Sequence, residues 1–494
     1  MTLGTLTLYI AIAALVLTLL VGLVFKAQKN WLITYLQNFT GALFVFSGWV
    51  KAIDPLGTAY KMEQYFAEFE ATFENTWFSF IAPMFPWLSE YAINFSVAVI
   101  IFEIVLGIML LIGALPRLTA WLFFLLVLFF TALTGFTYLT GFVPAEVNFF
   151  QFGQWVAFEE TNMKVTDCGC FGDFLKLKPK ISFFKDLFLL IPALIFLWQH
   201  KKFHQLFAPI TRTAIVTVSL VGLLIYCMSN YVWDLPHTDF RPFAVGKDVR
   251  TQKMLEEEAA ANTQVTAYKV TNKATGETKV IPIDEYLKVY QKEYPKEEWT
   301  SQQISSKPEI EATKISDFEI EGTDGMDIVP DLLDFPGYTL MVVAYKMPGD
   351  ISEQTLTVQD TSWIVDTVQI NGGDSIAYVK RVDQIQERQV ADQLYTFPDY
   401  YLERYQKLLI PIQQQGKEAG AKVFAATGFA DPEKLDDFKA AAGFDFPIYQ
   451  ADDILLKTIV RSNPGLVLWK DGKIVNKWHH KKFDEVGDVK LLLK

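Results

Sequence analysis

The pattern of apolar and polar positions changes character near residue 236. Before this point long apolar runs alternate with short polar loops, and after it short apolar runs alternate with charged segments. A helix that crosses about 30 Å of hydrocarbon needs roughly 20 apolar residues. Six runs approach this length, at 5–25, 33–53, 92–114, 118–141, 182–199 and 212–233. The pattern therefore predicts a six-helix transmembrane domain over residues 1–236.

The stretch at 66–88 differs from these six runs because aromatic residues alternate with glutamates in its first half. Aromatic side chains gather where a membrane meets water, and glutamate avoids the hydrocarbon. We therefore expect this stretch to lie at the level of the lipid headgroups and not to form a seventh span.

The second half of the chain has the pattern of a soluble α/β protein. Residues 237–315 are polar and predict a linker with a small hairpin, whose turn lies at 272–276. From 316 onwards apolar strands alternate with helical segments, and the run at 339–345 is typical of a buried parallel strand. We expect an α/β domain over 316–494, with an inserted segment of about 45 residues (351–395) that adds strands.

The number of charged residues also differs between the two halves of the chain. Residues 1–236 carry 27 charged side chains with a net charge of −1, whereas residues 237–494 carry 73 with a net charge of −11. Such a chain is not a simple cytosolic enzyme. It also offers no basic face that could neutralise phosphates, so the sequence argues against nucleic acid as a partner and for the lipid bilayer.

Several charged residues fall within or beside the apolar runs, where they are costly unless paired or hydrated. Glu103 lies inside the third run, Lys51 and Asp54 end the second, and Lys185 and Asp186 open the fifth. We expect a polar cluster between helices in which Glu103 faces Lys51. This cluster could relay protons or bind a polar headgroup. Alternatively, it is an ion pair that holds the helices together.

The chain has three cysteines, too few for a disulfide framework, and we predict no metal site. Cys168 and Cys170 flank one glycine. In extended chain their α-carbons would lie about 7 Å apart, so a disulfide between them would be strained and easily exchanged. The pair could exchange disulfides, shape the loop or be inert. Asp167 and Asp173 would raise the thiol pKa and the lysines at 176, 178 and 180 would lower it. Cys227 reads as an apolar packing residue.

A family resemblance follows from these segments. GALFVFSGWVKAIDP at 41–55, FEIVLGIMLLIGALPR at 102–117 and FFKDLFLL at 183–190 resemble the DoxX-like and MauE-like four-helix membrane proteins over about 35–200. DCGCFGD at 167–173 matches the Cys-Gly-Cys loop of MauE-like members. The whole chain resembles DoxX-family proteins of Bacteroidota type with a long soluble tail. The resemblance implies redox chemistry, namely thiosulfate–quinone oxidoreduction for DoxX proteins and disulfide maturation for MauE, with a quinone as candidate cofactor.

The segment 316–494 resembles the thioredoxin-like fold of the thiol-peroxidase and TlpA-like branch. Asn463-Pro464, before the run GLVLWKDGK, matches the family's cis-proline, which makes Pro464 the candidate for that position. The family's catalytic cysteines should follow the strand at 339–345, but KMPGDIS stands there without a cysteine. We therefore expect a thioredoxin-like domain lacking CxxC that acts as a binding or docking module.

Lysine and arginine counts in the loops do not decide the orientation of the spans. Disulfide chemistry and the resemblance both place the Cys168/Cys170 loop on the extracytoplasmic side, and two further spans return the chain to that side. We expect a multi-pass protein of the bacterial inner membrane with a periplasmic C-terminal domain. Its cysteine pair would exchange thiol and disulfide with an extracytoplasmic thiol protein, with quinone coupling as an option. The alternative is a non-enzymatic scaffold or docking subunit of an envelope complex.

Overall fold

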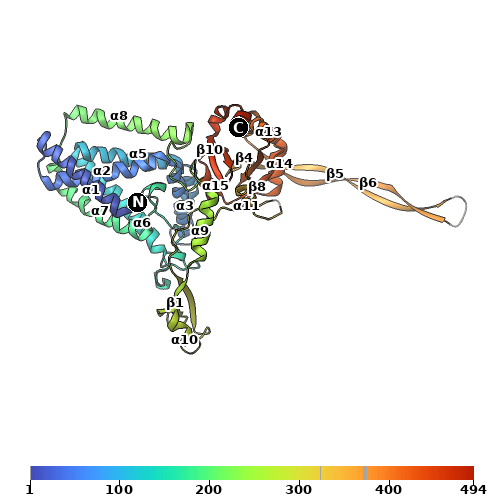
Figure 1. The fold of residues 1–494 in the computed structure, drawn as a ribbon, viewed down its shortest axis with the longest axis horizontal. Coiled ribbons are helices and arrows are strands. Elements are labelled where there is room, and N and C mark those ends of the chain that lie inside the picture. The colour runs from blue at the N-terminus through green and yellow to red at the C-terminus, as the bar shows by residue number, and fades with distance from the viewer. Residues whose placement is uncertain (1, 323, 371–374, 494) are drawn as a thin grey trace. The chain divides into compact units, whose positions relative to one another are not determined.

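The computed structural model describes residues 2–322, 324–370 and 375–493 (Figure 1). The chain divides into two compact units. The first unit consists of Met1–Lys247 and Thr251–Ser316, and the second of Asp248–Arg250 and Asp317–Lys494. The division agrees with the change in pattern along the sequence, because the long apolar helices all belong to the first unit. Each unit is described separately below.

Helices form most of the first unit. Their bounds are α1 Leu3–Leu19, α2 Trp31–Ile53, α3 Pro55–Phe73, α4 Met84–Glu90, α5 Ala92–Ile112, α6 Pro116–Thr140, α7 Pro179–Gln199 and α8 Pro209–Met228. In the part of the chain that the structure describes, five helices are long and apolar enough to cross a membrane. They are Leu3–Val24, Ala92–Ile112, Pro116–Thr140, Pro179–Lys202 and Pro209–Trp233. The prediction of several membrane helices is thereby confirmed.

The remaining predicted span is α2, which is a helix of 23 residues but is not among these five. It carries Gln37, Asn38 and Lys51, all buried inside the unit, and these polar side chains lower its mean hydropathy. Most of α2 is therefore surrounded by the rest of the first unit, and less of its surface is left to face lipid. The count of six spans therefore stays a prediction.

Close contact between α2 and α5 depends on glycine. A β-carbon added at Gly41 would lie 2.9 Å from the carbonyl oxygen of Gly107, and one added at Gly107 would lie 2.8 Å from the carbonyl oxygen of Gly41. Small residues at such crossings let helix backbones approach within a membrane. This contact brings the end of α2 beside the middle of α5, which is where Lys51 and Glu103 lie.

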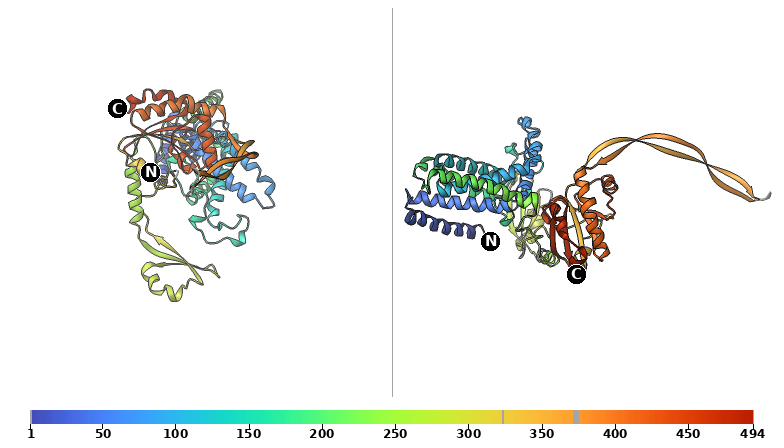
Figure 2. Two further views of the ribbon diagram at one scale, coloured as in Figure 1. Left: turned by 90° about the vertical axis from the view of Figure 1, so that its right-hand side faces the viewer. Right: turned by 90° about the horizontal axis from the view of Figure 1, so that it is seen from above.

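The helices α3 and α4 run in a different direction from the long helices. Figure 2 shows this segment, drawn in mid-blue, projecting sideways from one end of the helical bundle. Phe73 of α3 stacks on Phe85 of α4 with ring centroids 5.7 Å apart, and Phe69 contacts the same ring at 5.5 Å. The two helices therefore pack as one aromatic layer.

The segment at 237–315 contains two helices and three strands. They are α9 Val249–Ala261, β1 Val265–Asn272, β2 Thr278–Pro282, α10 Ile283–Glu293 and β3 Trp299–Ser305. The expected hairpin is β1 and β2, and β3 pairs with the other side of β1 in an antiparallel sheet of order β2-β1-β3. Val270, Ile281 and Tyr286 form its small core.

The second unit is a mixed five-stranded sheet with helices. Its strands are β4 Tyr338–Ala344, β7 Lys422–Thr427, β8 Ile448–Gln450, β9 Gly465–Lys470 and β10 Lys473–His479, in the order β10-β9-β4-β7-β8. The strand predicted at 339–345 is β4, which pairs in parallel with β7 and antiparallel with β9. The helices are α11 Val329–Leu333, α12 Asp399–Arg404, α13 Ile410–Glu418, α14 Pro432–Ala442, α15 Asp453–Ile459 and α16 Val489–Leu492. The Asn463–Pro464 peptide bond is cis.

The inserted segment forms one long ribbon in the second unit. Its strands β5 Asp350–Ile370 and β6 Ser375–Thr396 pair antiparallel with each other, and among the described residues they pair with no strand of the five-stranded sheet. Figure 1 shows the ribbon extending away from the sheet near α14. Large apolar side chains such as Trp363 and Tyr378 are exposed on it. An isolated two-stranded ribbon is marginally stable in water, so this element is the one in the unit that most needs a covering partner.

Candidate functional site

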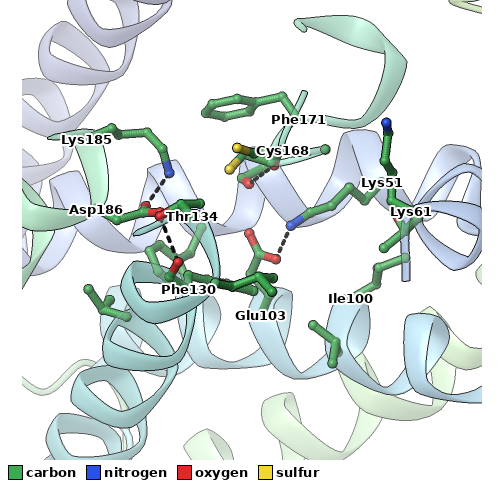
Figure 3. Close-up of a pocket in the computed structure, with 18 of the residues that line it drawn as sticks. Lys51, Lys61, Ile100, Glu103, Phe130, Thr134, Cys168, Phe171, Lys185 and Asp186 are labelled. Carbon is green, nitrogen blue, oxygen red and sulfur yellow. Dashed lines mark hydrogen bonds and ion pairs between the residues drawn. The ribbon is translucent and has the colours of Figure 1, made fainter. Parts of the chain in front are cut away.

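A pocket inside the first unit brings together residues that the sequence places far apart. Its walls come from α2, α3, α5, α6, α7 and the loop that carries the cysteine pair (Figure 3). Of the predicted site residues, Cys168, Cys170, Lys51, Glu103 and Asp186 line it. Apolar side chains complete the wall, among them Leu43, Phe44, Val127, Phe130, Leu133 and Leu189. The cavity has a volume of about 80 Å³, which is large enough to hold water.

One side of the pocket is a buried ion pair between Lys51 and Glu103. Lys51 belongs to the last turn of α2, and Glu103 lies in the middle of α5. The ammonium group of Lys51 also lies 5.5 Å from the centre of the Phe130 ring, so its charge faces both a carboxylate and an aromatic surface. Removal of either member would leave an uncompensated buried charge, so the two residues hold α2 and α5 in register.

A second ion pair faces the first across the pocket. The ammonium nitrogen of Lys185 lies 2.5 Å from Oδ1 of Asp186, and the hydroxyl of Thr134 donates to Oδ2 of the same carboxylate at 3.0 Å. Lys185 also lies 5.9 Å from the centre of the Phe171 ring. Asp186 is buried, so these donors compensate for the water that its carboxylate lacks. These two ion pairs therefore place two cations and two anions in mainly apolar surroundings, and Lys61 adds a third cation to the pocket wall.

The cysteine loop is held in place by polar contacts to α2 and α3. The Ser47 hydroxyl donates to the carbonyl oxygen of Cys170 at 2.8 Å, and Lys61 pairs with Asp167 at 3.0 Å. The Gly169 N–H donates to the Asp167 carboxylate, and Gly169 has a φ of +61°, a conformation that suits glycine. The turn between the two cysteines is thus specified by Gly169 itself, and its position by Ser47 and Lys61.

Cys168 and Cys170 are free thiols, the first buried and the second half-buried. Burial raises the pKa of the Cys168 thiol to about 12, and the neighbouring Cys170 raises it further. Burial also raises the pKa of Cys170, but Lys185 and Lys51 oppose this shift by favouring the thiolate. The charged residues next to the cysteines in sequence matter less than burial and the lysines of α2 and α7. Both thiols are protonated at neutral pH.

Two predicted residues lie elsewhere. Asp54 is not in the pocket wall, because its carboxylate caps the start of α3 and accepts the N–H of Gly57 at 3.1 Å. Pro464 belongs to the second unit. Cys227 is buried among apolar residues that include Ala52 and Val97, as a packing residue would be. Among the residues that the structure describes, no three His, Cys, Asp or Glu side chains are grouped to hold a metal ion.

Several pocket residues were missed from the sequence. Lys61 and Tyr65 lie one turn apart on α3, the segment that we read as interfacial from residue 66 onwards. Thr131, Thr134 and Thr137 all donate a hydroxyl hydrogen bond to a carbonyl oxygen of their own helix. Of these three, Thr134 also donates to Asp186, and the sequence does not distinguish it from the other two. The i, i+4 spacing of Lys61 and Tyr65 places both on one face of a helix, but it does not indicate that this face meets the pocket.

Comparison with known families gives one match. The family model described as Methylamine utilisation protein MauE matches residues 29–145, a range that covers α2 to α6 and includes Lys51 and Glu103. The matched range ends before the cysteine loop and does not reach the second unit. No curated protein and no solved structure matched the chain. The resemblance to DoxX proteins stays a prediction. The chain is a multi-pass membrane protein, and its residues 29–145 are a MauE family domain.

Proposed function

We propose that this protein is a membrane thiol–disulfide oxidoreductase in which Cys168 and Cys170 alternate between two thiols and one disulfide. The observation that carries the proposal is that both thiols line one pocket with the buried Lys51 and the half-buried Lys185. Closing the disulfide releases two electrons and two protons. A disulfide of an extracytoplasmic partner protein takes up both and becomes two thiols, and in the reverse exchange two thiols of such a partner supply both and reopen the disulfide.

Two lysines favour the thiolate form of Cys170, which burial disfavours. A thiolate is the nucleophile in disulfide exchange, and burial disfavours it at both cysteines. Lys51 and Lys185 lower the free energy of a thiolate at Cys170. Glu103 and Asp186 neutralise these lysines while the thiols are protonated, so the pocket keeps a balanced charge before the reaction. Exchange therefore starts at Cys170, which is also the more exposed thiol.

A quinone is the candidate cofactor of this site. The pocket residues fit such a group, because the wall is mainly apolar and the ammonium groups of Lys51 and Lys185 suit carbonyl oxygens. When bound, a quinone supplies a two-electron acceptor in the lipid phase. The residues of this chain would hold and orient its ring.

The placement of the protein follows from the same proposal. Disulfide chemistry requires an oxidising compartment, which for a bacterial inner-membrane protein is the periplasm. We infer that the cysteine loop and the second unit both lie there. The second unit would be a thioredoxin-like binding module. This inference is supported by the strand order β10-β9-β4-β7-β8 with a parallel central pair and by the absence of cysteine from residues 317–494.

The alternative function is a scaffold or docking subunit of an envelope complex. One observation favours it, namely the exposed ribbon of β5 and β6 with Trp363 and Tyr378 on its surface. Exposed apolar side chains on a long two-stranded ribbon with open edges are typical of a surface that meets another protein. Under this alternative the cysteine pair would have no function.

The two functions are distinguished by trapping mixed disulfides in cells. Cys168→Ser leaves Cys170 to attack a partner without a second thiol to release it, so a covalent adduct should accumulate on non-reducing gels. Cys170→Ser should give less adduct because Cys168 is only 8% exposed. Cys227→Ser is the matched control, since this cysteine is packed among helices. If no reducible adduct forms with either variant, the exchange proposal fails and the scaffold remains.

A further inference from the structure

A set of exposed aromatic side chains lies between α3 and α5. Trp77 is 81% exposed and Phe80 is 77% exposed, and Met84, Trp87 and Tyr91 are also exposed. Met84 and Trp87 are three residues apart and share one face of α4, and Tyr91 directly follows the helix as its C-cap. Residues 76–89 contain no charged side chain. A patch of this size on a protein surface marks contact with another protein or with a membrane.

The position of the patch along the chain favours a membrane as its covering surface. Tyr91 directly precedes Ala92, the first residue of α5, and α5 is one of the helices long and apolar enough to cross a membrane. Five extended residues reach at most about 17 Å, so Trp87 cannot lie far from the point where α5 enters the bilayer. The segment also projects sideways from the bundle end, across the direction of the long helices (Figure 2). If the long helices cross the bilayer, a segment that runs across their direction at the bundle end runs parallel to the membrane surface, where an apolar aromatic face can insert.

We propose that residues 76–91 form an interfacial anchor, with Trp77, Phe80 and Trp87 inserted among the lipid headgroups and upper acyl chains. Tryptophan and tyrosine favour this zone because their rings are apolar and their N–H and O–H groups can still meet water. The partner is a lipid surface, and no protein or second copy is required to cover these side chains.

The anchor has a consequence for the pocket. Phe85 of α4 packs on Phe69 and Phe73 of α3. One and two turns before Phe69 on the same helix, Tyr65 and Lys61 line the pocket, and Lys61 holds the cysteine loop through Asp167. The lipid surface thus fixes the height of α3, and through it the position of the loop, relative to the membrane. This role is separate from the thiol chemistry and stands whether or not the cysteines are redox-active.

The test measures depth in the full-length chain. Phe80→Cys and, as a matched control, Trp363→Cys on the exposed ribbon are each labelled with a nitroxide after Cys168, Cys170 and Cys227 are changed to Ser. The protein is placed in phospholipid nanodiscs, and collisions with oxygen, which enters lipid, and with a water-soluble nickel chelate are recorded by electron paramagnetic resonance.

We expect oxygen to reach the label at 80 several-fold more readily than the nickel chelate, with the reverse at 363. If the chelate reaches 80 as freely as 363, the segment lies in water and the proposal is wrong. If neither reagent reaches 80, protein covers the segment, and the lipid proposal is equally wrong. Because the serine background could disturb folding, brominated phospholipids provide a second measurement on the native-cysteine chain. Trp77→Phe/Trp87→Phe should reduce the fluorescence that these lipids quench, and Trp363→Phe should not.

Discussion

At the scale of single residues, the chemistry of the cysteine pair is governed by burial. Cys168 is the more buried of the two thiols, and Tyr65 and Ser182 lie beside it, whereas Lys51 and Lys185 act on Cys170. Flanking carboxylates and lysines suggested opposing effects on the thiols, and their sum could not be derived from the sequence. The structure shows why: the largest influence on both thiols is the loss of water, which sequence neighbours do not report.

The raised pKa of Cys168 predicts an unusual pH dependence of alkylation. Only the thiolate reacts with iodoacetamide, and with a pKa of about 12 its fraction rises about tenfold for each pH unit. Between pH 7 and pH 10 the alkylation rate of Cys168 in nanodiscs should therefore keep rising, by about 1000-fold. In the unfolded chain the rate should level off near pH 9, close to the ordinary cysteine pKa. A native rate that levels off below pH 9 would contradict the burial argument. Mass spectrometry of the Cys168 peptide provides the rate.

The ion pair of Lys51 and Glu103 predicts a strongly non-additive pair of substitutions. Glu103→Leu leaves the Lys51 ammonium buried without its carboxylate and should destabilise the protein by about 3–5 kcal/mol, as should Lys51→Met. The double variant removes both charges and should cost markedly less than the sum of the two. Reversible unfolding in mixed micelles measures all four proteins. Additive effects would show that the two side chains do not interact.

At the scale of elements, the crossing of α2 and α5 positions that ion pair. Gly41→Val would push a side chain against the Gly107 carbonyl, which belongs to the backbone and cannot rotate away. Overpacking of this kind typically costs about 1–3 kcal/mol. Gly222→Val in α8 is the matched control, because a β-carbon there meets nothing within 4 Å. The midpoint of thermal unfolding in detergent should fall for the first variant and hardly change for the second. Equal shifts would mean that the glycine contact has no special role.

The elements also show how far the sequence could be read. Long apolar runs predicted the membrane helices, and the short apolar run at 339–345 predicted β4. Both could be predicted because residues that are buried in lipid or in a core are apolar in the sequence. The strand β3 was missed because Thr300, Ser301, Gln302 and Gln303 have no apolar alternation, and it forms only through pairing with β1. For the site, Lys51, Glu103, Asp186 and the two cysteines could be selected because charge and thiol stand out in an apolar region. Lys61 and Tyr65 could not, since their place in the pocket depends on how α3 crosses the bundle end.

At the scale of the whole molecule, the chain combines a helical membrane unit with a sheet-containing unit that carries a long ribbon. The thiol pocket lies wholly within the first unit, and the ribbon wholly within the second. The oxidoreductase proposal needs the pocket, whereas the scaffold alternative needs the ribbon. The two can therefore be separated by changing one unit at a time.

A variant with a shortened ribbon should lose the scaffold function and keep the thiol chemistry. Replacing residues 354–392 by a two-residue Asn-Gly turn keeps Tyr395 and Phe397, which pack on the core of the second unit. Because the described ribbon strands pair with no strand of the five-stranded sheet, the free energy of unfolding should change by less than about 1 kcal/mol. Oxidation and reduction of Cys168 and Cys170 should be unaffected, as measured by thiol labelling. Loss of thiol cycling in this variant would tie the ribbon to the redox partner.

The central claim is that Cys168 and Cys170 change oxidation state together in the living cell. Differential alkylation measures this directly: cells are quenched in acid, free thiols are blocked, disulfides are reduced and labelled with a heavy reagent, and the peptides are weighed. The account predicts a mixed population in which both cysteines shift together toward disulfide after an oxidant pulse and toward thiol after dithiothreitol, while Cys227 stays a thiol. A pair that stays fully in one state under all three conditions would contradict it.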